Sequence, residues 1–408
     1  MVLAQTLGAQ GFGVFAYTLS IIAIAGIPFH QGLPNLVARN VAIYHSLTKW
    51  SAMRGLLLRA NQLVLGLSLL IVGLAAAVAL LLDISQTVLY TFLVALALLP
   101  CVALSGVRRG ALVGLHRPVL AQMPEHVIQP ALFIAFVGIT LLLIDKANFT
   151  PALAMALRVA TVVVEFCIGY LLLFRYLPEQ IKGCRATFDT SGWLRGAAAF
   201  MLIGGMGTIN TEIGILMLGM FGSIEEVGVY KGVTVLASLV TFVLQSFNTA
   251  LLPFVTKLYT EGDRERLQQI VTLSCRLVLL CGLPVAIVLI FFGEQCLLRL
   301  YGHEFSGGAT ALATLSVGLL LNTATGPVGL LLNASGHEWD TIKGKVIGMV
   351  LNIVLGAVLI PVWGLEGAAW ATTCSLLTWN VILVVLVRRR LNLHSTVFGA
   401  VSLRQSTS

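Results

Sequence analysis

Six ionisable side chains stand out among those that lie inside long apolar segments of this sequence. Ionisable residues in such surroundings line substrate or ion pathways, or form buried ion pairs. Arginine and lysine there can bind anions, and an arginine can hold a phosphate or carboxylate through two parallel hydrogen bonds. The candidate residues for substrate binding or gating are therefore Arg59, Arg158, Glu165, Glu212, Lys231 and Arg276.

The composition identifies the environment of these six residues. Of the 408 residues, 58% are hydrophobic and 10% are charged, and the mean hydropathy is +0.96. A soluble domain carries about 25% charged residues, so this chain cannot cover a water-exposed surface. It is an all-α integral membrane protein. The net charge of +8 is explained by anionic membrane lipids, and binding of nucleic acid is not expected.

Eleven segments are long and apolar enough to cross a membrane, which requires roughly 20 residues each. The expected spans are 12–34, 56–82, 87–106, 119–144, 151–174, 193–221, 227–252, 270–292, 307–334, 342–362 and 366–387.

Charge alternates between the connecting segments. Most of the Lys and Arg residues stand in every second connection, which the positive-inside rule places in the cytoplasm. The loops around Arg108 and Arg264 are then cytoplasmic, and those around Asp83 and Glu225 are external. The C-terminus is also expected in the cytoplasm.

The sequence repeats weakly at an offset of 215 residues. Residues 11–18 (GFGVFAYT) align with 226–233 (EVGVYKGV), so that Gly13 matches Gly228. Such parallel repeats occur in transporters. The second copy follows a full helix at about 193–221, whereas only MVLAQTLGAQ precedes the first. The expectation is that the first helix of a twelve-helix fold is missing, and the alternative is a genuine eleven-span protein.

The repeat predicts two pseudo-symmetric helical lobes. The expected organisation is an N-terminal lobe at 1–176, a cytoplasmic linker at 177–192, a C-terminal lobe at 193–388 and a cytoplasmic tail at 389–408.

The six candidates divide between these lobes. Arg158 is expected about 10–12 Å from the outer surface, and Glu212 at a similar depth in the other lobe, with Lys231 shallower. Opposite charges on two lobes suit a cavity or gate, and a structural ion pair between helices is the alternative. Arg59 and Arg276 lie near cytoplasmic ends of spans, where a long side chain can reach the interface instead of a substrate.

Several stretches, in this order and spacing, are similar to one protein family. They are LAQTLGAQGFGVFAYTLS at 3–20, GLPNLVARNVA at 32–42, VGVYKGVTVLASLV at 227–240, FNTALLPFVTKLY at 247–259, YGHEFSGGATALATLS at 301–316 and LNIVLGAVLIPVWGLEGAAWATT at 351–373. Through them the chain resembles the polysaccharide-transporter flippases of O-antigen type. These belong to the multidrug, oligosaccharidyl-lipid and polysaccharide exporter superfamily.

The resemblance implies a mechanism and a substrate. The two lobes would enclose a cavity that opens alternately to either side of a bacterial cytoplasmic membrane. The substrate would be a polyprenyl-diphosphate-linked oligosaccharide for O-antigen, capsule or exopolysaccharide synthesis. Partners would be membrane lipids, a glycan polymerase and other polysaccharide-assembly proteins. A diphosphate requires Arg or Lys in the cavity, which agrees with Arg158.

Three other functions compete with this interpretation. A lipid II flippase has closely related chemistry. A cation-coupled multidrug exporter of the same superfamily should favour carboxylates in its cavity, and Arg158 and Lys231 weigh against it. A membrane enzyme needs a catalytic constellation, and no DxD, nucleophile elbow, metal cluster or cofactor motif occurs in the sequence. No catalytic, metal or cofactor residue is therefore assigned.

Polar amides in the spans have two interpretations. They can hydrogen-bond sugars, or they can join neighbouring helices, which is the default for membrane proteins. They are left outside the predicted site: Asn210, Gln245, Asn248, Asn322, Asn333 and Asn352.

Overall fold

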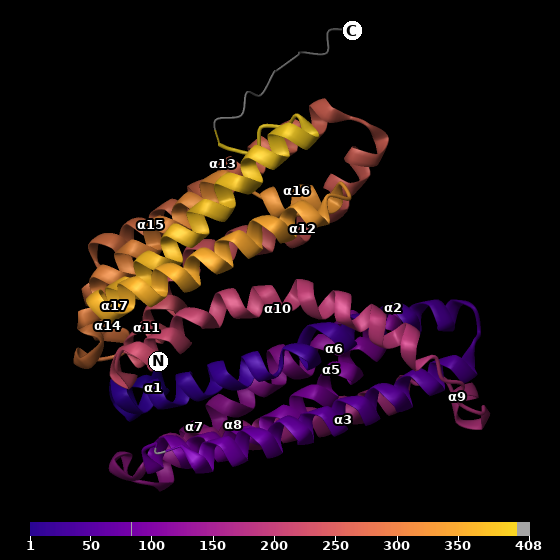
Figure 1. Ribbon diagram of the computed structural model, residues 1–408, viewed down its shortest axis with the longest axis horizontal. Coiled ribbons are helices and arrows are strands. Elements are labelled where there is room, and N and C mark those ends of the chain that lie inside the picture. The colour runs from indigo at the N-terminus through magenta and orange to yellow at the C-terminus, as the bar shows by residue number, and fades with distance from the viewer. Residues whose placement is uncertain (83, 398–408) are drawn as a thin grey trace. The chain divides into compact units, whose positions relative to one another are not determined.

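The computed structural model describes residues 1–82 and 84–397, and within these ranges the chain is helical and has no strands (Figure 1). It forms two compact units. We call Val14–Glu212 the N-unit, and Met1–Gly13 together with Ile213–Ser408 the C-unit. The N-unit extends further along the chain than the predicted N-terminal lobe. The lobe boundaries remain a prediction about repeat symmetry.

Two long helices contribute to both units, namely α1 (Val2–Ala25) and α10 (Thr190–Phe221). The remaining helices of the N-unit are α2 (Leu33–Ser46), α3 (Trp50–Leu81), α4 (Gln86–Leu96), α5 (Leu98–Gly114), α6 (Pro118–Met123), α7 (Gln129–Leu143), α8 (Pro151–Tyr176) and α9 (Gln180–Gly183). Three short turns complete it: two π-helical turns, η1 (Pro28–Gly32) and η2 (Pro124–Ile128), and the 3₁₀ turn η3 (Lys146–Asn148).

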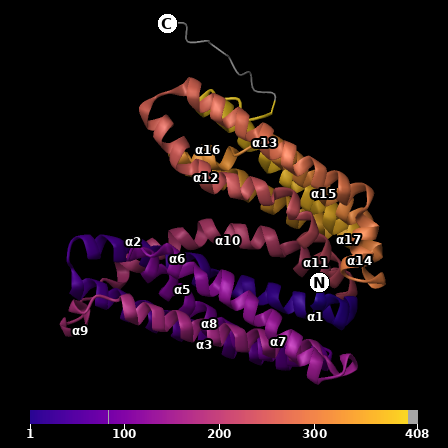
Figure 2. The ribbon, with the colours of Figure 1, turned by 180° about the vertical axis from the view of Figure 1, so that it is seen from behind.

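The C-unit is a second helical bundle. Its helices are α11 (Ile224–Ala237), α12 (Leu239–Glu261), α13 (Arg264–Phe291), α14 (Gly293–Leu300), α15 (Ala309–Thr325), α16 (Val328–Ala334) and α17 (Glu338–Leu391), with the 3₁₀ turn η4 (His303–Gly308). Figure 2 shows the helices of each unit from behind.

The helices have the length and composition of membrane spans. In the described part of the chain, eight are long and apolar enough to cross a membrane, or nine if the bent pair α11 and α12 counts as one span. Helix α17 has 54 residues, or about 81 Å at 1.5 Å per residue, which is more than twice the hydrocarbon thickness. Its backbone breaks at Gly364, where φ is 50°, between the two spans expected at 342–362 and 366–387.

Side-chain chemistry sets several helix ends. Ser223 and Glu226 form a capping box at the start of α11, because each side chain accepts the other's backbone N–H, at 3.2 and 2.9 Å. The Asp263 side chain caps α13 by accepting Arg266 N–H at 3.0 Å. Gly262 ends α12 in the left-handed conformation, which favours glycine.

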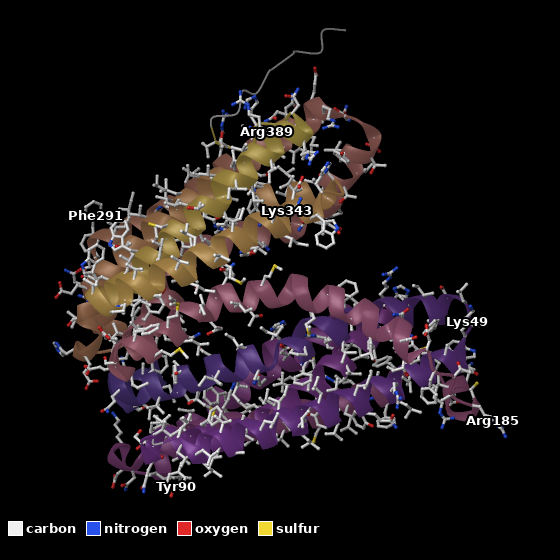
Figure 3. All side chains as sticks on the ribbon, in the orientation of Figure 1. Lys49, Tyr90, Arg185, Phe291, Lys343 and Arg389 are labelled. Atoms are coloured by element: carbon white, nitrogen blue, oxygen red, sulfur yellow. The ribbon has the colours of Figure 1, made fainter. Side chains whose placement is uncertain are left out.

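Basic residues gather at one end of each unit. In the N-unit, Lys49 and Arg185 lie at the end opposite Tyr90; in the C-unit, Lys343 and Arg389 lie toward the end opposite Phe291 (Figure 3). This pattern supports the predicted alternation of loops, while the orientation in the membrane stays a prediction.

The structure does not place two of the topology markers, Arg108 and Asp83, in loops. Arg108 is not in a loop, because α5 continues to Gly114 and buries it. Asp83 lies outside the described residues, as does the end of the tail from residue 398.

The two glycines matched by the repeat lie against each other within the C-unit. A Cβ on Gly13 would stand 1.8 Å from the Ile224 carbonyl oxygen, and a Cβ on Gly228 would stand 2.0 Å from the Ala9 carbonyl oxygen. Ala9 and Ile224 are also 215 positions apart, so the two contacts are reciprocal, as they would be around a two-fold axis. This reciprocity supports the sequence repeat.

We expect Gly228→Ala to lower the thermal unfolding midpoint of the purified protein. The added methyl group would force the two backbones apart, and overpacking of this kind costs about 1–3 kcal/mol. The control is Gly73→Ala in α3, where no atom lies within 4 Å of the new Cβ and alanine favours the helix. Equal midpoints for Gly228→Ala and the wild type would contradict this close contact.

Candidate functional site

Among the residues of the N-unit whose side chains the structure describes, the most deeply buried charges form an ion pair between α5 and α8. Arg108 and Glu165 are only 2% and 3% exposed. Arg108 Nη2 donates to Glu165 Oε1 at 2.6 Å, and Ser105 Oγ donates to Glu165 Oε2 at 2.9 Å. Gly169 makes room for the guanidinium, since a Cβ there would lie 1.5 Å from Arg108 Nη1. Both oxygens of Glu165 are therefore engaged within the protein.

The next arginine, Arg109, forms a second ion pair, with Glu125. Both side chains are partly exposed, at 22% and 32%. Glu125 lies in η2, the π-helical turn between α6 and α7 that begins at Pro124. Such turns occur frequently at functional sites because they shift side chains out of the regular helical register.

Arg158, on α8, is held by an amide and an aromatic ring. With the Gln129 amide oriented so that its oxygen faces the guanidinium, Oε1 accepts from Nη1 and Nη2 of Arg158 at 3.0 and 3.1 Å. The guanidinium carbon also lies 5.5 Å from the centroid of the Phe133 ring. No carboxylate of the described residues lies within ion-pairing distance of Arg158. Its neighbour on the same helix, Glu165, is bound to Arg108 instead.

Together these groups form a layer of polar side chains inside the N-unit, which we call the arginine layer: Arg108, Arg109, Glu125, Gln129, Arg158 and Glu165. The layer contains three guanidinium groups and two carboxylates, so it has an excess of positive charge when all five groups are ionised. The excess is located at Arg158, because the other two arginines each have a carboxylate partner. The layer is therefore suited to an anion.

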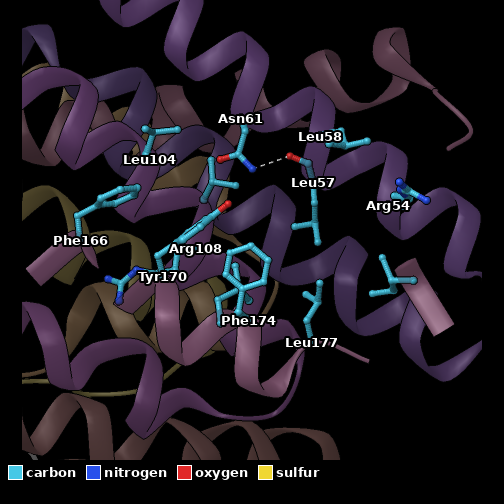
Figure 4. Close-up of a pocket in the computed structure, with 13 residues that line it drawn as sticks. Arg54, Leu57, Leu58, Asn61, Leu104, Arg108, Phe166, Tyr170, Phe174 and Leu177 are labelled. Atoms are coloured by element: carbon cyan, nitrogen blue, oxygen red, sulfur yellow. Dashed lines mark hydrogen bonds between the residues drawn. The ribbon is translucent and has the colours of Figure 1, made fainter. Parts of the chain in front are cut away.

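An apolar pocket of about 500 Å³ borders Arg108 (Figure 4). On the side formed by α8 it is lined by three aromatic rings in a row, those of Phe166, Tyr170 and Phe174. The ring centroids of Phe166 and Tyr170 are 5.6 Å apart, and those of Tyr170 and Phe174 are 4.6 Å apart. Arg54 lines it near the start of α3 and donates to the Cys184 carbonyl oxygen at 2.6 Å. The pocket has the size and lining to accept a hydrocarbon chain.

The other predicted residues lie elsewhere. Glu212 accepts a hydrogen bond from Ser20 Oγ at 2.6 Å in the N-unit. Lys231 is half-buried on α11 of the C-unit. Arg59 Nε donates to Thr190 Oγ1 at 3.2 Å.

Arg276 is exposed on α13. Its Nε donates to the Val397 carbonyl oxygen at 3.3 Å, beside the last described stretch of the chain. Of the six candidates, the structure thus brings Arg158 and Glu165 into one polar layer, in which they have different partners.

The C-unit contains a pocket of about 410 Å³ whose lining includes several side-chain amides that sequence reasoning had left outside the site. We call it the amide pocket. It lies among α12, the junction of α15 with α16, and α17. Its polar and aromatic lining residues are Gln245, Asn248, Asn322, Asn333, Lys345, Trp379 and Asn380.

Sequence reasoning missed parts of both sites. Four of the amides that line the amide pocket were considered, but helix joining was the default interpretation. Arg108 was expected in a basic connecting segment, and Lys345 lies in the basic start of the span expected at 342–362. The apolar run ALVGL after Arg109 is the signal that could have shown that α5 continues past both arginines.

Comparison with known proteins gives two family matches. The family described as polysaccharide biosynthesis protein matches residues 1–259, and the lipid II flippase MurJ family matches residues 131–407. A probable low-salt glycan biosynthesis flippase of Haloferax volcanii is 23% identical over 243 residues, which are 59% of this chain and 50% of that protein. The chain thus spans half the length of that relative.

Two further proteins are similar over most of the chain. Stage V sporulation protein B of Bacillus subtilis is 23% identical over 400 residues, covering 91% of this chain and 76% of that protein. A solved structure of a multidrug resistance MATE family transporter in an inward-facing conformation has a TM-score of 0.76 at 14% identity, covering 96% and 93% of the two chains.

The structural likeness shows a two-lobed helical fold like that of the MATE transporter, and the Haloferax relative is named as a probable flippase. Each family match covers more than half of the chain. The chain therefore belongs to the polysaccharide biosynthesis and lipid II flippase families.

Proposed function

We propose that this flippase translocates a polyprenyl-diphosphate-linked oligosaccharide by alternating access, for the synthesis of O-antigen, capsule or exopolysaccharide at a bacterial cytoplasmic membrane. Such a substrate carries a diphosphate and many hydroxyl groups through hydrocarbon, where each unsatisfied polar group costs several kcal/mol. A polar interior that binds the diphosphate removes most of this cost.

The observation that carries the proposal is the environment of Arg158. Its guanidinium is held by the neutral oxygen of Gln129 rather than by a carboxylate. A diphosphate oxygen could replace that amide oxygen, and it would add the attraction between opposite charges to the paired hydrogen bonds that a guanidinium makes with phosphate. The exchange would favour an anionic substrate without leaving a buried carboxylate unpaired.

The same layer argues against a cation-coupled multidrug exporter. Glu125 and Glu165 are both bound to arginines, so neither is available to a cationic drug. Lipid II transport is the second candidate, because the lipid II flippase family matches residues 131–407 and that substrate also carries a diphosphate. Glu212 and Lys231 are proposed as gating residues, and Arg59 and Arg276 as contacts for the headgroup near the membrane interface.

Deletion of the gene in its native cells tests the proposal. We expect lipid-linked glycan to accumulate on the cytoplasmic leaflet and the surface glycan to disappear, while lipid II continues to reach the outer leaflet. Accumulation of lipid II instead would support the second candidate. Normal distribution of both lipids would contradict a flippase role for either substrate.

A further inference from the structure

We propose that the amide pocket of the C-unit binds sugar units of the transported lipid, so that the headgroup is recognised separately from its diphosphate. This inference rests on the proposed function. It concerns a different part of the molecule, because every residue that lines the amide pocket belongs to the C-unit, whereas the arginine layer belongs to the N-unit.

The lining chemistry matches sugars. Each side-chain amide offers a carbonyl acceptor and two N–H donors, and sugar hydroxyl and acetamido groups need both kinds of partner. No hydrogen bond joins the side-chain amides of Asn248, Asn322 or Asn333 to another residue of the described chain. Asn248 Oδ1 is buried in this state, and a buried acceptor without a partner is costly. A bound sugar hydroxyl could supply the missing donor.

The charge and the amides of the pocket argue against a cationic drug and against a lipid chain as its ligand. Its one charged lining residue in the described chain is Lys345, whose Nζ lies 5.5 Å from the centroid of the Trp379 ring. A cationic drug would meet an ammonium group and no carboxylate. A lipid chain would leave the amides unsatisfied. A polar headgroup that is neutral or weakly anionic fits both the amides and the lysine.

A break in the backbone between α15 and α16 lies at this pocket. Gly326 adopts a positive φ of 75° and is followed by Pro327, so α15 ends there and α16 begins at Val328. This break places Asn322 and Asn333 on two different helices that both line the pocket. Asn380 is fixed at the wall, because its Nδ2 donates to the Leu376 carbonyl oxygen at 2.8 Å and its Oδ1 accepts from Thr325 at 3.3 Å.

The experiment compares two probes on the purified full chain: polyprenyl diphosphate alone, and polyprenyl diphosphate carrying N-acetylglucosamine. Affinities are measured by native mass spectrometry. We expect the wild type to bind the sugar-bearing lipid more tightly than the sugar-free lipid. Asn248→Ala should lower the affinity for the sugar-bearing lipid about 3- to 10-fold, which is the effect of one or two neutral hydrogen bonds. Affinity for the sugar-free lipid should not change. Asn333→Ala should act in the same way.

The control is Asn40→Ala, which removes an amide of the N-unit that donates to the Leu36 carbonyl oxygen. It should leave the affinities for both lipids unchanged. If neither lipid bound the wild type, the proposed function would fail. If both bound equally well, or if Asn248→Ala and Asn333→Ala lowered both affinities alike, the flippase proposal would stand and the sugar-binding role of the amide pocket would be overturned.

Discussion

Replacing Arg158 with glutamine should reduce transport at least tenfold without unfolding the protein. A hydrogen bond to a charged group contributes about 1.5–3 kcal/mol, and each 1.4 kcal/mol corresponds to about a factor of ten. The fold should survive because the partner of Arg158 is the neutral Gln129, so the substitution strands no carboxylate. The measurement is the amount of surface glycan in cells that contain equal amounts of each protein.

Two further variants separate charge from geometry. Arg158→Lys keeps the positive charge but loses the planar pair of donors, so we expect partial function. The double variant Arg158→Gln with Glu212→Gln should not recover, because Glu212 accepts from Ser20 and is not the partner of Arg158.

An arginine outside the arginine layer provides the control for these variants. Arg117 is exposed and stacks on Tyr176 in the same unit, so Arg117→Gln should transport normally. Full surface glycan with Arg158→Gln would remove Arg158 from the site.

The fold could be predicted largely from the sequence because membrane spans are local features. Length and hydrophobicity place a helix with no knowledge of its neighbours. The eleven expected segments lie largely on helices, although some of them, such as 12–34 and 307–334, extend over more than one element. The interruption at 363–365 contains Gly364, where the backbone of α17 breaks.

The partners of the charged residues could not be predicted in this way. Spacing shows that Arg158 and Glu165 share a face of α8, but it does not show which helix packs against that face. Glu165 meets Arg108 because α5 lies against α8 and Gly169 leaves space for the guanidinium. Likewise, Asn248 and Asn333 stand 85 positions apart in the sequence, and only the packing of α12 beside α16 brings them to one pocket.

Breaking the Arg108–Glu165 pair should have the largest effect on stability. Glu165→Leu leaves a guanidinium that is 2% exposed without its carboxylate, and removal of one partner of a buried pair costs about 3–5 kcal/mol. Arg108→Met should cost a similar amount. Gly169→Ala should act through the same pair, because the new methyl group would displace Arg108 Nη1. We expect each single variant to unfold at a lower temperature and to accumulate poorly.

The double variant Arg108→Met with Glu165→Leu tests whether the ion pair itself is needed for stability. Replacing both partners of a buried pair with apolar residues of similar volume is often neutral, so the double should regain most of the lost stability. The control is Arg109→Gln, whose ion pair with Glu125 is partly exposed and whose loss should cost less.

The transport activity of the folded double variant separates two roles for Glu165. Its oxygens are already engaged by Arg108 and Ser105, so a substrate would have to displace one of them. If the pair only joins α5 to α8, the recovered protein should also transport glycan, since Arg158 keeps its own partner. A stable double variant that displays no surface glycan would instead place Glu165 or Arg108 in direct contact with the moving substrate.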